Sequence, residues 1–224
     1  MAGKVGVVAT GQVALGPGRA RPTPRRYVAT FGPAGQLGDL TYAAAEALGG
    51  TRAPTQVVLG DGAAWIKQQA ALHFPDAIRI LDWSQLWRVL RRAIRAVHPG
   101  RSGRAERRVQ AWTLGDALWH GQVAEARAQL VALRRSDATI EALEDAIGYL
   151  DTQRDWLGND QAWQDAGDPV GSGLIERAVA IVSNRRMQRQ GMRWRRDSAN
   201  AIVALRVDQL NRDWAAVDDL PFAA

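Results

Sequence analysis

The order of strand and helix patterns between residues 55 and 97 constrains the fold more than any other feature. A valine-rich apolar run at 55–60 precedes a helical pattern at 63–74, and a short apolar run at 77–81 precedes a second helical pattern at 86–97. Strands that alternate with helices favour parallel pairing, because each helix carries the chain back along the sheet. The sequence therefore predicts an α/β fold with a parallel pair of strands.

Two further strands are predicted ahead of this core. The valine-rich residues 4–10 and the segment at 25–31 have strand composition, and we expect them to form an antiparallel hairpin. The segment between them, residues 11–23, is rich in glycine, proline and arginine and is interpreted as a turn region. Apolar residues at helical spacing predict a helix over 35–48.

The pattern changes after residue 98 and becomes helical only. Between residues 104 and 163 apolar residues recur at helical spacing, and no strand pattern interrupts them. We therefore predict an α-helical insertion at 99–165, which divides a core made of residues 1–98 and 166–224. A last helix is expected over 198–214.

Two aspartates directly follow the strands of the predicted parallel pair. Asp61 comes after the first strand and Asp82 after the second. Reactive groups in open α/β sheets collect at the carboxyl ends of the strands, so both carboxylates are candidate ligands for a divalent metal such as Mg²⁺. The alternative for each is a turn aspartate that accepts a hydrogen bond from its own backbone.

A third carboxylate, Glu176, lies in the first turns of a predicted helix over 174–184. Ser172 precedes this helix and is a plausible N-cap. Glu176 lies beside the apolar stripe of the helix and not on it. Its carboxylate can therefore extend past the edge of the surface against which the helix packs. The alternative is a solvated glutamate that the helix dipole favours at an N-terminus.

Charge and composition point towards a nucleic-acid partner. The net charge is +6 and the chain has no cysteine, which excludes disulfides, thiolate metal sites and a cysteine nucleophile. Arginine suits bidentate phosphate contacts, although a solvated basic surface is the alternative. The candidate DNA-binding residues follow the Glu176 helix and are Arg185, Arg186, Arg189, Arg193, Trp194, Arg195 and Arg196. Trp194 either stacks on a base or packs against the last helix.

Four segments resemble bacterial insertion-sequence transposases of the ISKra-type branch, which is related to the Mutator-like group. They are VVLGDGAAWI (57–66), FPDAIRILDW (74–83), VGSGLIERAV (170–179) and GMRWRRDSANAIVALR (191–206). The resemblance implies a ribonuclease-H-like core with a helical insertion, an Asp-Asp-Glu triad, and Mg²⁺ or Mn²⁺ chemistry on DNA ends. It identifies Asp61 as the second aspartate of the triad and Glu176 as its glutamate.

The sequence departs from the family pattern in two places. The family's first aspartate belongs on a strand upstream of residues 4–10, and Asp39, the only aspartate before Asp61, lies in a predicted helix. Gln85 stands where relatives tend to carry a histidine, and glutamine cannot take a proton near neutral pH. We therefore expect a core that is incomplete at its N-terminus, with a gap or an exposed edge in its sheet.

Three functions remain open from the sequence. The first is a transposase that cleaves and transfers DNA at transposon ends, here as a fragment without the first aspartate. The second is a non-catalytic, regulatory transposase remnant that binds DNA, associates with itself, or associates with the full-length enzyme. The third is a small-ligand domain in which residues 171–173 bind phosphate at a helix N-terminus. No secretory signal or membrane span is recognised, so we expect a cytoplasmic protein.

Overall fold

The computed structural model of the protein describes residues 3–16, 19–22, 24–134, 140–187 and 192–212. The chain is of the α/β class and divides into two compact units. Unit 1 contains Met1–Gln56, Trp65–Asp76 and Gly173–Ala224, and unit 2 contains Val57–Ala64 and Ala77–Ser172.

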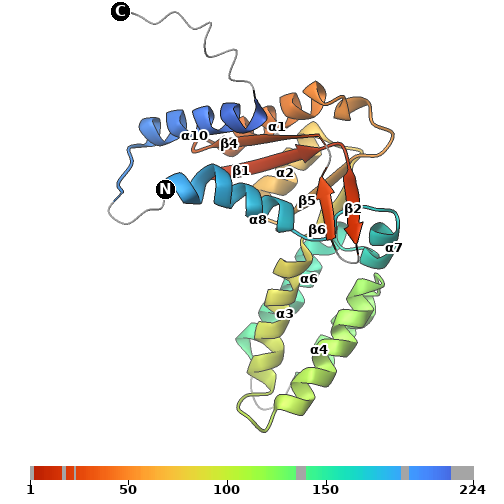
Figure 1. The fold of residues 1–224 in the computed structure, drawn as a ribbon. Coiled ribbons are helices and arrows are strands. Elements are labelled where there is room, and N and C mark those ends of the chain that lie inside the picture. Colours follow the sequence, from red (N-terminus) through yellow and green to blue (C-terminus); the bar gives the residue numbers. More distant parts are fainter. Residues whose placement is uncertain (1–2, 17–18, 23, 135–139, 188–191, 213–224) are drawn as a thin grey trace, which may run out of the picture. The chain divides into compact units, whose positions relative to one another are not determined.

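Unit 1 is built on an antiparallel pair of strands (Figure 1). Strand β1 (Lys4–Ala9) pairs with β4 (Arg25–Thr30), and Lys4 lies opposite Thr30. This pairing confirms the predicted hairpin. The turn region predicted at 11–23 is wrong, because β2 (Gln12–Gly16) pairs there with β3 (Arg19–Pro22). Glycine, proline and arginine interrupt the alternation of apolar and polar residues by which strands are recognised in a sequence. Strand pairing itself is made by backbone hydrogen bonds and does not depend on that alternation.

Helices cover both faces of the β1–β4 pair. They are α1 (Ala34–Ala47), α2 (Ala64–His73), α8 (Gly173–Val179) and α10 (Arg196–Asn211). Tyr27 and Ala29 pack with Val182 and Val203, whereas Val28 packs with Leu37 and Ala44 of α1. Neighbouring strand residues thus enter different clusters, as the two-residue repeat of a strand requires.

The helix that carries Glu176 is less regular than the sequence predicts. Helix α8 continues as a π-helical segment, Ala180–Asn184, and then as the short helix α9 (Arg185–Met187). The predicted helix over 174–184 is confirmed, and the wider turn in its second half is a feature that periodicity alone does not report. Val182 in this widened turn is fully buried.

The two edges of the β1–β4 pair differ. At the outer edge of β4, Tyr27 N donates to Asn211 Oδ1 at 2.8 Å, Asn211 Nδ2 donates to Tyr27 O at 3.0 Å, and Phe31 N donates to Asn200 Oδ1 at 2.9 Å. In an antiparallel pair, opposite residues alternate between pairs that bond to each other and pairs whose backbone groups point outward on both sides. Val7 lies opposite Tyr27, so its backbone N–H and C=O point outward from β1, at the other edge. Among the described residues no strand pairs with that edge of β1.

Unit 2 begins with the parallel pair that the sequence predicts. Strand β5 (Val57–Gly60) lies beside β6 (Ile78–Leu81), with Val57 opposite Ile78 and Gly60 opposite Leu81. Helix α3 (Trp83–Val97) follows β6 at once, three residues earlier than the predicted start at residue 86.

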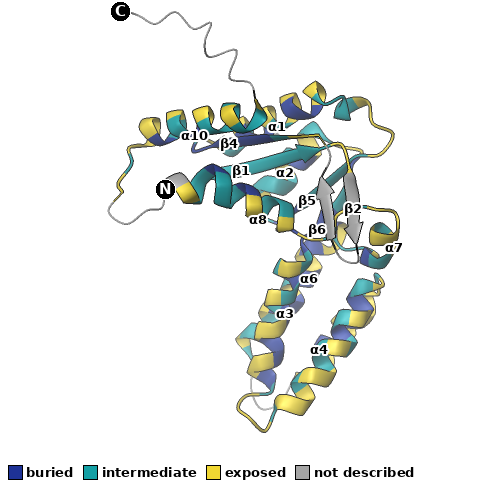
Figure 2. Ribbon diagram, in the orientation of Figure 1, coloured by how far each residue is buried: buried dark blue, intermediate teal, exposed yellow. Residues whose placement is uncertain are grey.

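The rest of unit 2 is helical. Its helices are α4 (Arg104–Trp119), α5 (Val123–Ala132), α6 (Glu141–Gln153) and α7 (Asp160–Asp165), with a 3-10 turn at Arg154–Trp156. No strand occurs in the described part of 104–163, as predicted. The inner faces of α3, α4 and α6 are buried (Figure 2), and their fully buried leucines are Leu86, Leu90, Leu114, Leu118, Leu143 and Leu150. Strands β5 and β6 and helix α3 thus share a unit with these helices, whereas the predicted division placed them in the part spanning 1–98.

Candidate functional site

The register of the parallel pair sets the position of two candidate carboxylates. Gly60 is the last residue of β5 and Leu81 the last of β6, and these two residues lie opposite each other. Asp61 and Asp82 therefore both begin at the carboxyl edge of the pair, one residue beyond the last rung. Reactive groups of α/β proteins gather at such an edge.

Asp61 is exposed and lies at the start of a tight turn. Its Oδ1 accepts a hydrogen bond from Ala63 N at 2.9 Å, which is the local turn bond that the sequence left as an alternative. Gly62 has φ +80°, and a Cβ there would lie 2.5 Å from Gln153 Oε1. Both the backbone angle and the close approach therefore require glycine directly after Asp61.

Helix α6 supports this turn through two polar side chains. Gln153, which is buried, donates from Nε2 to Gly62 O at 3.1 Å, and the Tyr149 hydroxyl donates to Asp61 O at 3.4 Å. Burial raises the pKa of Tyr149 to about 12, with further increases from the negative charges of Asp61 and Asp82 and an opposing effect of Arg88. Tyr149 is therefore a protonated donor at neutral pH rather than a base.

Sequence reasoning missed Tyr149 and Gln153. They lie four residues apart, so they share one face of α6. Gln153 continues the buried stripe of Leu143, Ala146, Ile147 and Leu150, and a polar residue on such a stripe indicates a buried hydrogen-bond partner. That signal was present, but the partner lies 91 residues away in the chain.

Asp82 has a structural role that is visible in its hydrogen bonds. Its carboxylate is 2% exposed and is the N-cap of α3, with Oδ1 accepting from Ser84 N at 3.1 Å and Oδ2 accepting from Ser84 Oγ at 2.9 Å. Oδ1 also accepts from Ser172 N at 3.1 Å. These three bonds occupy most of the lone-pair sites of a carboxylate. A part for Asp82 in metal binding stays a prediction.

The same bonds fix the segment that leads into α8. Trp83 N donates to Val170 O at 3.3 Å, and Ser172 N donates to Asp82. The backbone N–H of Ser172 is part of this tether, and its Oγ lies 3.4 Å from Ser84 Oγ. The N-cap role of Ser172 stays a prediction. The chain immediately before Gly173 is therefore held to the start of α3.

Glu176 is exposed and lies in the first turn of α8. It belongs to unit 1, whereas Asp61 and Asp82 belong to unit 2. The convergence of Glu176 with Asp61 stays a prediction. Within the described parts of the chain, no group of three or more His, Cys, Asp or Glu side chains is close enough to hold a metal ion.

The predicted DNA-binding segment is partly described. Arg185, Arg193, Arg195 and Arg196 are exposed, whereas Trp194 is half-buried and donates from Nε1 to Met187 O at 3.2 Å. Trp194 also packs against the cluster of α8 and α10, which supports the packing alternative over base stacking. Arg189 and the side chain of Arg186 lie outside the described residues. DNA binding by this segment stays a prediction.

Comparison with known proteins identifies no relative. No protein-family model matches the chain, and no curated protein or solved structure matches it either. Among the described residues, no helix has both the length and the apolar character needed to cross a membrane.

Proposed function

We propose that the protein is a DDE-type transposase chain in which Asp61 and Glu176 are two of the carboxylates that hold Mg²⁺ or Mn²⁺ for cleavage and transfer of DNA strands. The observation that carries this proposal is the β5–β6 register, which starts Asp61 at the carboxyl edge of a parallel pair. The resemblance of the segments around Asp61 and Glu176 to insertion-sequence transposases supports the same assignment.

A ribonuclease-H-like core is the finer fold that we propose. It is supported by an antiparallel pair (β1–β4) that precedes a parallel pair (β5–β6), followed by a helical stretch and then the Glu176 helix. The edge of β1 that pairs with no described strand is where such a core would receive the strand bearing the first aspartate. The helical stretch would then be the family's insertion.

The donor set suits a hard divalent cation. Asp61 presents an exposed carboxylate, and Mg²⁺ prefers oxygen ligands supplied by a few carboxylates together with substrate phosphate. Such ions, when bound, activate a water or hydroxyl and stabilise the leaving oxygen of a phosphodiester. In this chain Tyr149 and Gln153 would hold the Asp61 turn in place, and the Asp82–Ser172 bond would fix the chain ahead of Glu176.

One observation favours a non-catalytic function for this chain by itself. Asp39, the only other aspartate ahead of Asp61, lies on α1 with its side chain 77% exposed and 3.5 Å from His73 Nε2, so it does not extend a strand end. The described residues thus offer two of the three carboxylates that the resemblance implies. The second candidate function is therefore a non-catalytic DNA-binding or regulatory remnant, which would act in the cytoplasm on transposon ends, on itself or on a full-length transposase.

Metal binding and plasmid nicking test the first function. We expect Asp61→Asn and Glu176→Gln each to weaken Mn²⁺ binding at least about tenfold, because each removes a charged ligand. Electron paramagnetic resonance of free Mn²⁺ measures this, and Mn²⁺-dependent nicking of supercoiled plasmid should fall in parallel. Asp39→Asn is the matched control and should change neither. Mn²⁺ binding and nicking that survive both replacements would remove the assignment.

The regulatory function makes a different prediction in the same preparations. DNA binding that weakens steeply with salt and persists in Glu176→Gln, with no metal-dependent nicking by the unmodified chain, would select the remnant over the enzyme. Absence of DNA binding at moderate salt would contradict both functions.

A further inference from the structure

Four arginines form one stripe along α3. Arg88, Arg91, Arg92 and Arg95 are spaced by three, one and three residues, which places Arg88 with Arg92 and Arg91 with Arg95 in two adjacent rows on the solvent-facing half of the helix. All four are exposed, and the opposite side of α3 carries Leu86, Leu90, Ala93, Ile94 and Val97, which are buried. The stripe is therefore a solvent-facing surface on a helix that the core of unit 2 holds in place.

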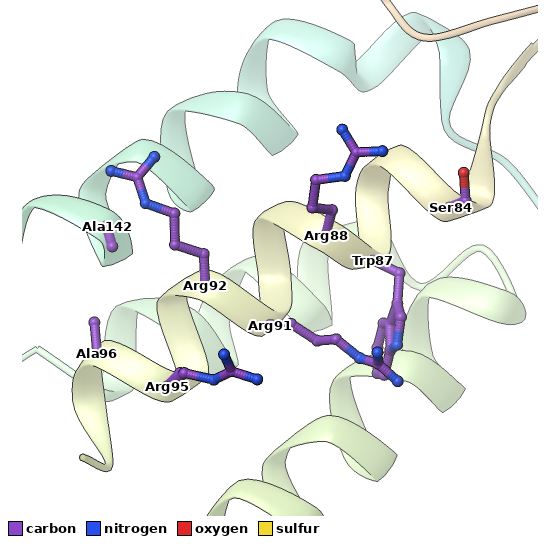
Figure 3. A pocket seen from close by; sticks show the side chains of 8 residues that line it. All are labelled: Ser84, Trp87, Arg88, Arg91, Arg92, Arg95, Ala96 and Ala142. Carbon is purple, nitrogen blue, oxygen red and sulfur yellow. The ribbon is translucent and has the colours of Figure 1, made fainter. Parts of the chain in front are cut away.

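The four arginines line a groove with Ser84, Trp87, Ala96 and Ala142 (Figure 3). In Figure 3 the guanidinium groups of Arg88 and Arg92 extend from one side of α3 and those of Arg91 and Arg95 from another. Among the described residues one carboxylate forms an ion pair with the stripe, namely Asp145 at 3.6 Å from Arg92. Both partners are more than half exposed, so this pair offsets little of the positive charge.

Trp87 is held from several directions. Its ring stacks on Trp83 with centroids 6.1 Å apart and an interplanar angle of 10°, and the Arg91 guanidinium lies 5.4 Å above it. A Cβ added at Gly115 of α4 would come within 3.2 Å of the Trp87 ring. Because these neighbours surround its ring, Trp87 holds the Arg91 guanidinium in place and has no free ring face on which a base could stack.

We propose that this arginine groove binds the phosphate backbone of duplex DNA without reading its sequence. Guanidinium groups pair bidentately with phosphate, and the stripe from Arg88 to Arg95 is about 10 Å long at 1.5 Å per residue. That length matches roughly three phosphates of one strand at about 3.4 Å each along the duplex axis. The occupied ring of Trp87 leaves no free aromatic platform for a base in the groove, which favours contacts to the phosphate backbone.

This inference rests on the proposed function only for the choice of DNA as the polyanion. The groove contains neither Asp61 nor Glu176, so its binding is independent of metal chemistry. If the protein binds DNA through the groove but does not nick plasmid, the groove remains a DNA-binding site and the transposase assignment is wrong.

Fluorescence anisotropy with a labelled duplex of random sequence, in EDTA, tests the groove. Replacing all four arginines by glutamine should weaken binding at least about tenfold at low salt and lower the slope of log K against log salt by up to about 0.9 for each arginine lost. Arg101, Arg104, Arg108 and Arg154 are exposed arginines of the same unit outside the groove, and their fourfold glutamine variant is the charge-matched control.

Three outcomes would overturn the proposal. They are equal weakening in the groove and control variants, unchanged binding in the groove variant, and displacement of the duplex by polyglutamate or by an RNA hairpin as effectively as by unlabelled DNA. Circular dichroism melting checks that each variant is folded. Should the fourfold variant unfold, Arg88→Gln and Arg95→Gln measured singly must each weaken binding for the proposal to stand.

Discussion

Replacing Asp82 by alanine should lower the free energy of unfolding by about 2–4 kcal/mol. Loss of an N-cap typically costs about 1 kcal/mol, and α3 would lose the acceptor of Ser84 N. The Ser172 N–H would in addition be left buried without its acceptor, which costs about 1–3 kcal/mol. Urea denaturation followed by circular dichroism measures the loss.

Asp82→Asn is the matched control for this prediction. Asparagine keeps one carbonyl oxygen that can accept from Ser84 N and Ser172 N, so most of the stability should return. If alanine and asparagine at position 82 are both harmless to stability, Asp82 is not the structural cap described above. A metal-ligand role for Asp82 would instead appear as loss of Mn²⁺ binding in Asp82→Asn with little change in unfolding.

Asp160→Asn should stabilise the protein at pH 8 by about 2–4 kcal/mol and leave it nearly unchanged near pH 4. Asp160 is 4% exposed, its Oδ1 has no hydrogen-bond partner among the described residues, and burial raises its pKa to about 7. Each pKa unit corresponds to about 1.4 kcal/mol between the two protonation states. Asparagine has a similar shape and carries no charge to bury.

The direction of the pH effect follows from proton binding. Because the pKa of Asp160 is higher in the folded than in the unfolded chain, the folded chain binds more protons between about pH 4 and pH 7. The free energy of unfolding contributed by this group is therefore largest below pH 4, falls as the pH rises to about 7, and is constant above. Urea titrations at pH 4.5, 6 and 8 should show a stability gap between variant and unmodified protein that widens with pH. A constant gap would contradict the assignment.

The regular elements could be predicted because their patterns are local. Valine-rich runs marked β1 and β5, and apolar residues at helical spacing marked α1 and α6. The β2–β3 pair could not be recognised, because its strands are short and interrupted by residues typical of turns. The early start of α3 could have been predicted, since Asp82 followed three residues later by Gln85 is a capping pattern. The strand pattern ahead of Asp82 indicates only a strand-end aspartate.

The candidate site was predictable only in part for a different reason. The position of Asp61 after a strand is local information, and so is that of Glu176 near a helix start. The partners that hold the site, Tyr149 and Gln153 on the Asp61 turn and Ser172 on Asp82, are 88 to 91 residues distant in sequence. Such contacts depend on tertiary packing, which periodicity does not encode.

We propose that Asp61 and Glu176 converge to hold one metal centre. The chain has no cysteine, so Asp61→Cys and Glu176→Cys together provide two unique sites for nitroxide spin labels. Single-label variants at each position supply the reference spectra, and thermal melting verifies that the doubly labelled protein is folded.

The electron paramagnetic resonance spectrum of the doubly labelled protein tests that claim most directly. Convergence predicts strong dipolar broadening relative to the sum of the two single-label spectra, as expected for labels on neighbouring side chains. A spectrum equal to that sum, together with a long distance between the two labels in pulsed double electron–electron resonance, would contradict the shared metal centre. It would also contradict the transposase function that depends on that centre.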